Sequence, residues 1–370
     1  MNFNQSKVKS FRRCQKAYSF EYDYADEGFE LKPKYPSLPL KIGSWLHTLQ
    51  EAYHREWAVE SGFDPELVYD QERWRGEEKE RILDELGWKA AHRALTEEFD
   101  KLFVEEKEIY GDIPDQAYRL FTSYLRHWEK EGDKERYKIA ALHDGRPAIE
   151  FLVQQPLSKS HMFKGRIDVM VEDAEYGGLW IWDAKWVKSL PKPDERMMSP
   201  QSLMYVWGQR KAGYDVRGFV FNYGRKKPPT IPPLLKKGFL TTRHSLDTDV
   251  YTYLREIKRT HGGDWKKLAR TYYADKIEEL KARHNDWFRR ERIPTDPARI
   301  AKALKEFGVT AKDILRRDLE NPPRTYIPFS CPFMCDYHDL CVSEFNGLDI
   351  SGLIKANFVQ QEERYVNVES

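Results

Sequence analysis

Two short stretches, Gly165-Arg-Ile-Asp168 and Asp183-Ala-Lys185, decide the fold predicted for this chain, and fourteen residues separate them. Around each stretch apolar and polar residues alternate, which is typical of a half-buried β-strand. Residues two apart on a strand point the same way, so Asp183 and Lys185 share one face. Asp168 lies on the preceding strand, and we expect the two strands to form a hairpin in which its carboxylate converges on the same point.

The chemistry of this triad points to a divalent cation. Two carboxylates a few ångströms apart repel each other unless a cation lies between them, and carboxylate oxygens suit Mg²⁺ or Mn²⁺. A lysine beside the cation can orient or deprotonate a water, while the metal offsets charge on a phosphodiester in the transition state. An Asp-x-Lys triplet is common in charged chains, however, and taken alone it also fits a surface charge alternation on an edge strand.

The surrounding pattern predicts a β-β-β-α-β unit. Strand-like alternation runs over residues 148–187 with a break at Gly177-Gly178, and a helix containing residues 201–210 leads to a further strand at 218–223. Trp180, Trp182 and Trp186 alternate onto the face opposite Asp183. We expect these three rings in the core rather than as a platform for stacked bases.

Helical spacing of apolar residues predicts helices on both sides of this unit, over residues 1–60, over 76–132, and beyond the proline-rich loop at 228–233. Asp296-Pro297 is expected to begin a helix that ends at Gly308. Thr310 with Asp313 is expected to begin the next helix, which ends at Asn321. The tail after Asp349 is polar and uninformative about structure.

Composition places the chain among soluble, folded proteins. Its 370 residues are 40% hydrophobic, 33% charged and 14% aromatic, and the mean hydropathy is −0.76. No run approaches the ~18 apolar residues of a membrane-spanning helix, and residues 1–14 lack the apolar core of a secretory signal. We therefore expect a cytoplasmic protein with no membrane partner.

The charge is balanced overall but segregated along the chain. A net charge of +1 gives no sign of a nucleic-acid partner, yet between Tyr205 and Leu240 eight basic residues accompany a single acid, Asp215. A second basic cluster comprises Lys7, Lys9, Arg12, Arg13 and Lys16. Such segregation fits a basic groove for phosphates, and it fits two solvated faces equally well.

The four cysteines are unevenly distributed. Cys14 stands alone, whereas Cys331, Cys335 and Cys341 fall within eleven residues. In a cytoplasmic chain this clustering favours a metal site over disulfides.

Taken together, these motifs resemble those of the PD-(D/E)XK nuclease superfamily, and within it the RecB/AddB-like exonucleases with their CRISPR-associated and phage relatives. That family has, in order, a histidine on an N-terminal helix, a Gly-x-x-Asp strand end, an Asp-x-Lys strand and a helix bearing Gln-x-x-x-Tyr. The matching residues here are His47, Asp168, Asp183, Lys185, Gln201 and Tyr205. Their order agrees throughout, and the resemblance runs from Ser6 to Cys341.

The resemblance implies a metal site and a catalytic lysine. His47, Asp168 and Asp183 would hold Mg²⁺ or Mn²⁺, with the carbonyl of Ala184 contributing, and Lys185 would position the nucleophilic water. Without the resemblance, His47 would fit a solvated helix face equally well.

The resemblance also implies supporting residues. Gln201 and Tyr205 would brace the site or touch DNA phosphate. Glu150, eighteen residues before Asp168 on the preceding strand, is either a further site residue or a surface residue.

Exonucleases of this family often carry an iron–sulfur cluster held by one cysteine before the nuclease core and three after it. The resemblance thus implies a 4Fe-4S cluster on Cys14, Cys331, Cys335 and Cys341. One spacing departs from the family pattern, because three residues separate Cys331 from Cys335 where two are usual. Structural zinc, which also takes four thiolates, is the alternative.

The fold implied is α/β, with a restriction-endonuclease-like mixed-sheet nuclease core and large helical flanking and inserted segments. The predicted divisions are an N-terminal helical segment (1–60), a helical insertion (61–145), the nuclease core (146–230), a C-terminal helical region (231–325), the cysteine segment (326–345) and a tail (346–370).

The function expected is that of a metal-dependent exonuclease on single-stranded DNA or DNA ends, with Arg225, Lys226 and Lys227 contacting phosphates. The chain has no Gly-x-x-x-x-Gly-Lys-Ser/Thr motif, so unwinding would need a helicase or another recombination or repair partner. Two alternatives stay open: a cluster-bearing DNA-binding subunit with a vestigial nuclease site, and an RNA or structure-specific nuclease on the same fold.

Overall fold

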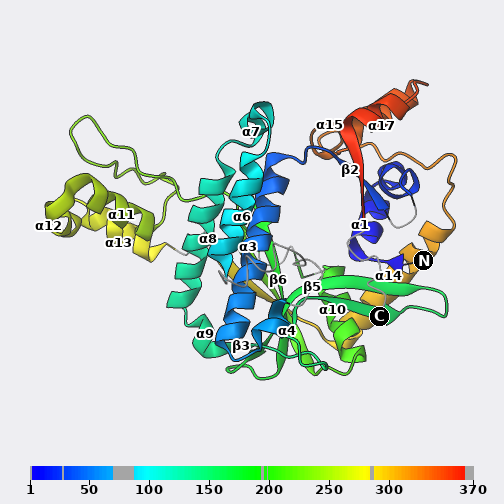
Figure 1. Cartoon of the computed structure of the whole chain (residues 1–370), viewed down its shortest axis with the longest axis horizontal. Coiled ribbons are helices and arrows are strands. Elements are labelled where there is room, and N and C mark those ends of the chain that lie inside the picture. Colours follow the sequence, from blue (N-terminus) through cyan, green and yellow to red (C-terminus); the bar gives the residue numbers. More distant parts are fainter. Residues whose placement is uncertain are drawn as a thin grey trace.

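The computed structural model describes residues 2–26, 29–69, 87–192, 196–197, 199–283 and 287–362. At its centre is a mixed sheet whose main path is β5 (Met162–Asp173), β6 (Leu179–Val187), β7 (Val216–Arg225) and β8 (Phe288–Ile293) (Figure 1). Three further strands, β1 (Asn2–Phe3), β3 (Tyr137–Ile139) and β4 (Ile149–Pro156), also pair with β5. The predicted mixed α/β architecture is confirmed.

The predicted β-β-β-α-β unit is confirmed as β4, β5, β6, α10 (Pro200–Lys211) and β7. The pairs β4–β5 and β5–β6 are antiparallel, whereas β6 and β7 run parallel. Parallel neighbours need a crossover connection, and α10 supplies it by packing on β4 and β7. The crossover places the first turn of α10 beside the carboxyl end of β6, where the Asp-x-Lys triplet lies.

Helices cover both faces of the sheet because β6 buries alternate residues on opposite sides. Ile181 packs in an apolar cluster with Leu203 of α10, and Trp182 packs in another cluster with Trp57 of α3 (Leu38–Glu60). Trp182 and Trp186 are buried, which confirms the expected core position of both rings, while Trp180 is half-buried.

A helical layer next to α3 contains α6 (Trp88–Asp100), α7 (Val104–Tyr110) and α8 (Ile113–Lys130), followed by the short α9 (Asp133–Arg136). The helices predicted over 76–132 are thus confirmed from residue 88 onward, and residues 70–86 lie outside the described part of the chain. The Asp112 side chain caps α8 by accepting a hydrogen bond from the Asp115 amide at 3.1 Å. Among the described residues, no helix combines the length and apolar character needed to cross a membrane.

The two ends of the described chain meet. Near the N-terminus lie α1 (Gln5–Arg13), α2 (Gln15–Tyr18) and β2 (Phe29–Pro33), and near the other end lie α15 (Cys331–Met334), α16 (His338–Phe345), α17 (Ser351–Asn357) and β9 (Phe358–Glu362). β2 pairs with β9 in an antiparallel ladder. The residues after Asp349 carried no local signal for this strand, because the segment gains its order from a partner strand more than 300 positions away.

A second correction concerns α14, which runs unbroken from Pro297 to Leu315. The predicted start is confirmed, since the Asp296 side chain accepts from the Arg299 amide at 3.0 Å. The predicted end at Gly308 and the new start at Thr310 were wrong. A glycine inside a helix costs only about 1 kcal/mol, and the buried apolar face continues past it with Ala311 and Ile314.

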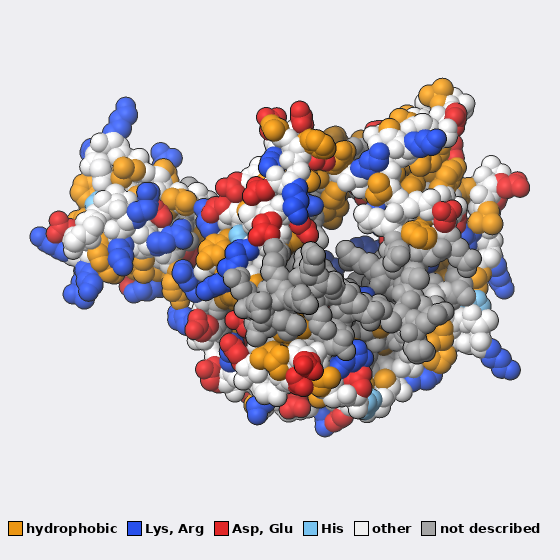
Figure 2. Space-filling view, in the orientation of Figure 1, with side chains coloured by type: hydrophobic (Ala, Val, Ile, Leu, Met, Phe, Trp, Pro, Cys, Tyr) orange, Lys and Arg blue, Asp and Glu red, His pale blue; other side chains and the backbone are white. Residues whose placement is uncertain are grey.

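Residues 228–283 form what we call the β7–β8 insertion. It contains α11 (Val250–His261), α12 (Trp265–Arg270) and α13 (Ala274–Ala282), and it stands out beyond α8 as a separate lobe (Figures 1 and 2). Its small apolar core consists of Leu240, Tyr253, Ile257, Tyr273, Ile277 and Leu280. The insertion leads into β8, a strand of sequence FRRERI that apolar patterning did not predict.

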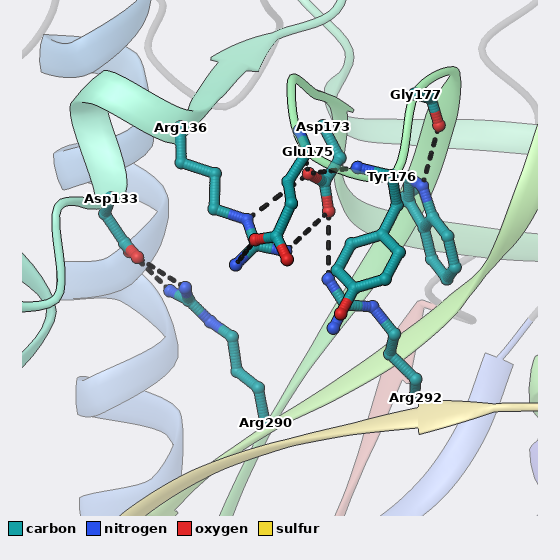
Figure 3. Close-up of polar contacts among 9 residues, drawn as sticks. Asp133, Arg136, Asp173, Glu175, Tyr176, Gly177, Arg290 and Arg292 are labelled. Carbon is teal, nitrogen blue, oxygen red and sulfur yellow. Dashed lines mark hydrogen bonds and ion pairs between the residues drawn. The ribbon is translucent and has the colours of Figure 1, made fainter.

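Arginines of β8 pair with two buried carboxylates, Asp133 of α9 and Asp173 of β5 (Figure 3). Arg290 of β8 donates to both carboxylate oxygens of Asp133, and its guanidinium carbon lies 3.6 Å and 4.0 Å from the ring centroids of Trp128 and Trp182. At the β5–β6 turn, Asp173 accepts from Arg136 and Arg292. These pairs neutralise two carboxylates that are buried in the fold and fix β8 at the edge of the sheet.

Candidate active site

The Asp-x-Lys triplet lies at the carboxyl half of β6, where it meets α10. Asp183 is 3% exposed. Its Oδ1 accepts a hydrogen bond of 2.8 Å from Gln201 Nε2 in the first turn of α10, and its Oδ2 forms an ion pair with Lys185 Nζ. The helix that closes the parallel crossover thus fixes the orientation of this carboxylate.

Asp168 and His47 approach from the neighbouring strand and from α3. Asp168 Oδ2 accepts a 2.6 Å hydrogen bond from the Ala184 amide, which ties β5 to β6 at the site. The same oxygen lies 3.9 Å from His47 Nδ1. The structure therefore brings together five of the predicted residues, namely His47, Asp168, Asp183, Lys185 and Gln201.

Burial makes Asp183 an unusual carboxylate. It raises the pKa of Asp183 from the ordinary value of 3.8 to about 6; the nearby Asp168 acts in the same direction, whereas Lys185 and His47 oppose the rise. A cation beside the two carboxylates would remove this penalty, so the donor set fits Mg²⁺ or Mn²⁺. Across the described residues, no group of three or more His, Cys, Asp or Glu side chains is arranged as a finished metal cage, and Lys185 already pairs with one oxygen of Asp183.

Tyr205 supports the site by packing its ring against Gly165 of β5. Its ring is buried and packs on the Gly165 backbone, where an added Cβ would lie 2.5 Å from Tyr205 Cε1. The glycine of the Gly165-Arg-Ile-Asp168 stretch is therefore needed for close packing of α10 on β5. Tyr205 is one helical turn from Gln201, so this packing also sets the position of Gln201.

Glu150 of β4 has a strained backbone next to the site. Its φ of +47° is the left-handed conformation that non-glycine residues rarely adopt. The ladder pairs Ile149 with Val169 and Phe151 with Ile167, which places Glu150 across from Asp168. Strain of this kind is concentrated at functional sites, and no sequence pattern announces it.

The family model of the PD-(D/E)XK nuclease superfamily matches residues 2–342. The chain belongs to this superfamily. No curated protein matches it. The membership confirms the restriction-endonuclease-like fold expected from the sequence, and it indicates metal-dependent phosphodiester hydrolysis, typically with Mg²⁺ or Mn²⁺ and with DNA as the substrate.

One cation near Lys185, the side chain of Lys9, was not among the site residues predicted for this nuclease. Lys9 of α1 is exposed, yet partial desolvation and the nearby Arg196, Lys185 and Arg13 lower its pKa. Lys185 Nζ and the Arg196 guanidinium carbon lie 6.0 Å and 5.9 Å from the Phe221 ring centroid. The basic N-terminal cluster was the only sequence signal for this arrangement.

The three predicted DNA-binding residues of the nuclease make contacts within the protein. Arg225 donates to both oxygens of Asp247, at 3.1 Å and 2.9 Å, and Lys227 Nζ lies 3.3 Å from the same carboxylate. Lys226 donates to the Pro39 carbonyl at 2.6 Å. These contacts hold the end of β7 to the β7–β8 insertion and to the start of α3, and binding of DNA by these residues stays a prediction.

The four cysteines of the nuclease converge where the chain ends meet, and all four are free thiols. The Thr325 amide donates to Cys14 Sγ at 3.4 Å, and Cys331 Sγ donates to the Thr325 carbonyl at 3.6 Å. Cys14, Cys335 and Cys341 pack against one apolar cluster around Tyr337 and Leu340. Burial raises the pKa of Cys335, and the neighbouring Cys331 and Cys14 add to the rise. As at the carboxylate site, the described side chains do not form a finished metal cage here.

Proposed function

We propose that this nuclease is a metal-dependent exodeoxyribonuclease of the RecB/AddB-like type that degrades single-stranded DNA or DNA ends. The observation that carries the proposal is the convergence of Asp168, Asp183 and Lys185 from two paired strands. A vestigial site would be expected to have lost at least one member of this set. A helicase or another recombination or repair protein would supply DNA ends as its partner.

In this proposal Asp168, Asp183 and His47 hold Mg²⁺ or Mn²⁺, and the Ala184 carbonyl contributes. The metal would offset charge on the scissile phosphodiester and lower the pKa of a bound water. Lys185, which lies against Asp183, orients the attacking water by hydrogen bonding and adds positive charge close to the phosphate. Gln201 keeps Asp183 in place through the 2.8 Å hydrogen bond.

Tyr205 and Glu150 complete the arrangement. Tyr205 braces α10 against Gly165, and Glu150 adds a third carboxylate opposite Asp168. Because Glu150 is held in a costly backbone conformation, its position serves the site rather than the strand.

We further propose that Cys14, Cys331, Cys335 and Cys341 together bind a 4Fe-4S cluster, with zinc as the alternative metal. Support comes from Cys14, Cys335 and Cys341 on one apolar cluster and from Cys331 close to Cys335, since thiolates are the ligands of such clusters. Cys14 and Cys331 are 317 positions apart, so a shared centre would fasten the two ends of the chain next to the β2–β9 ladder.

The test is digestion of 5′- and 3′-end-labelled single strands with Mg²⁺ or Mn²⁺, with a matching RNA strand in parallel. Asp183→Ala and Lys185→Ala should each reduce the rate by at least ~10³-fold, because the site residues act as a unit. Asp215→Ala is the matched control, since Asp215 is an exposed carboxylate of the same core that pairs only with surface Arg217 among the described residues.

The results separate the candidate functions. Substantial cleavage by purified Asp183→Ala protein would refute the assignment of the site. Binding of DNA by the wild type without any cleavage would point to a structural subunit, and preferential cleavage of the RNA strand would make the protein a ribonuclease.

A further inference from the structure

We propose that the β7–β8 insertion is a binding arm that holds single-stranded DNA by its phosphates, on the exposed basic surface of α11 and α12. This inference rests on the proposed function, because that function makes single-stranded DNA the substrate. It assigns a second contact, away from the carboxylates, to the part of the strand that is not being cleaved.

The insertion is a structural unit that the sheet itself does not require. β7 and β8 are antiparallel neighbours, and such strands can be joined by a turn of a few residues. The insertion instead has a core of its own, held by hydrogen bonds from the Tyr253 hydroxyl to the Thr241 carbonyl at 2.9 Å and from the Leu240 amide to the Tyr273 hydroxyl at 2.9 Å. The connection between β7 and β8 therefore does not by itself account for this lobe.

The surface of this lobe is strongly basic (Figure 2). From Val250 to Arg270 the chain has six Lys and Arg residues and two acidic ones, a net charge of +4 where the whole chain carries +1. All six cationic residues are exposed, namely Arg255, Lys258, Arg259, Lys266, Lys267 and Arg270. The rest of the chain thus carries a net charge of −3, so α11 and α12 form a local region of positive potential.

Most of these cations are available to a ligand. Of the two acids, Glu256 is buried and pairs with Arg255 at 3.4 Å and Arg259 at 2.6 Å. No carboxylate in the described part of the chain pairs with Lys258, Lys266, Lys267 or Arg270. The short 3₁₀ turn Gly262–Asp264 brings the last turn of α11 next to α12, so these cations form one surface rather than two.

An aromatic ring lies on the same lobe. Tyr272 is 50% exposed, and its ring stacks on Phe239 with centroids 4.3 Å apart and an interplanar angle of 30°. A ring supported from behind and open in front is suited to stack on an unpaired base. Cations for phosphates combined with an aromatic platform are the features by which proteins bind single strands without reading their sequence.

The test is the full-length triple variant Lys258→Glu/Lys266→Glu/Lys267→Glu. Binding is measured without added divalent metal, on single strands of about 40 and about 8 nucleotides, so that only the longer strand can extend from the core to the lobe. Three lost phosphate contacts should lower the slope of log K against log salt by about 2 and weaken binding of the longer strand roughly 100-fold at about 0.1 M salt. The matched control is Lys302→Glu/Lys305→Glu/Lys312→Glu, the same charge change on exposed residues of α14, which should bind like the wild type.

The outcomes are separable from those of the proposed function. Cleavage of the shorter strand with Mg²⁺ or Mn²⁺ should proceed at the wild-type rate in the triple variant, because the arm is not part of the site. If the triple variant bound the longer strand with the affinity and salt slope of the wild type, the inference would be overturned, even if the enzyme cleaves DNA. The basic lobe would then be expected to bind an acidic protein partner. An equal loss in the α14 control would also overturn it, because the effect would then reflect net charge alone.

Discussion

Replacing Asp183 by asparagine should stabilise the metal-free protein at pH 8. Burial raises the pKa of this carboxyl from 3.8 to about 6, and one pKa unit corresponds to about 1.4 kcal/mol. Keeping Asp183 ionised in the folded state therefore costs about 3 kcal/mol relative to the unfolded chain. Asparagine has nearly the same shape and no charge to bury, so the variant should gain about 3 kcal/mol, or roughly 4 °C in Tm for a chain of this size.

The pH dependence has a definite sign. The folded protein keeps the proton on Asp183 up to about pH 6, whereas the unfolded chain releases it near pH 3.8. The folded state thus binds more protons within this window, and the stability of the wild type falls as the pH rises through it. The advantage of Asp183→Asn should therefore grow between about pH 4 and pH 6, stay constant above, and vanish below about pH 4.

The assay is thermal and urea unfolding of chelator-treated protein from pH 4 to pH 8, with Asp173→Asn as the matched control. Burial opposes ionisation of Asp173, but hydrogen bonds from Arg136 and from the amides of Tyr176 and Glu175 outweigh it and lower its pKa. Its charge is therefore stabilising above the unfolded pKa, and this contribution is lost as the pH falls. Asp173→Asn should be destabilised by about 2 kcal/mol at pH 8, the opposite sign to Asp183→Asn.

Added Mg²⁺ or Mn²⁺ completes the test. The metal should stabilise the wild type by mass action and do so less for Asp183→Asn, and its effect on the wild type should fade below about pH 6 as Asp183 becomes protonated. A metal-free Asp183→Asn protein that is less stable than the wild type at pH 8 would refute the reasoning. Lys185 would then stabilise the carboxylate by more than burial costs it.

Three other substitutions test separate features. Gly165→Ala should lower the free energy of unfolding by about 2 kcal/mol and slow cleavage, because the new methyl group displaces Tyr205. The control Gly263→Ala has open space around it and should change neither the stability nor the cleavage rate. Anaerobically purified wild type should be brown, with an absorption shoulder near about 400 nm from thiolate-bound iron, and Cys14→Ser should lose the colour, the shoulder and the iron and have a lower Tm. A colourless wild type with one zinc per chain would assign zinc instead. Glu150→Gly should raise the free energy of unfolding by about 1 kcal/mol, because glycine adopts the left-handed backbone without strain, and it should slow cleavage. An unchanged cleavage rate would show that the strained residue has no role in catalysis.

Local pattern was sufficient for the centre of the fold. The alternation in β5 and β6 and the helix that follows identified the hairpin, the crossover and the face shared by Asp183 and Lys185, because a strand has a side-chain period of two and a parallel neighbour requires a crossover. The Asp296 cap of α14 was likewise readable from a few adjacent residues. Where the pattern was weak or misleading, as in the charged strand β8 and at Gly308, burial against distant elements decided the structure.

Long-range contacts decided the rest. The distance from His47 to Asp168, the backbone of Glu150 across from it, and the meeting of Cys14 with Cys331 depend on how separate elements pack, and no local propensity encodes that packing. The same holds for the charges: Arg225 and Lys227 pair with Asp247, while the cations of α11 and α12 remain exposed. The sequence by itself determined which residue types are present and in what order, and the tertiary structure determined which of them are buried and paired and which are left to bind a ligand, because burial and pairing depend on neighbours far away in the chain.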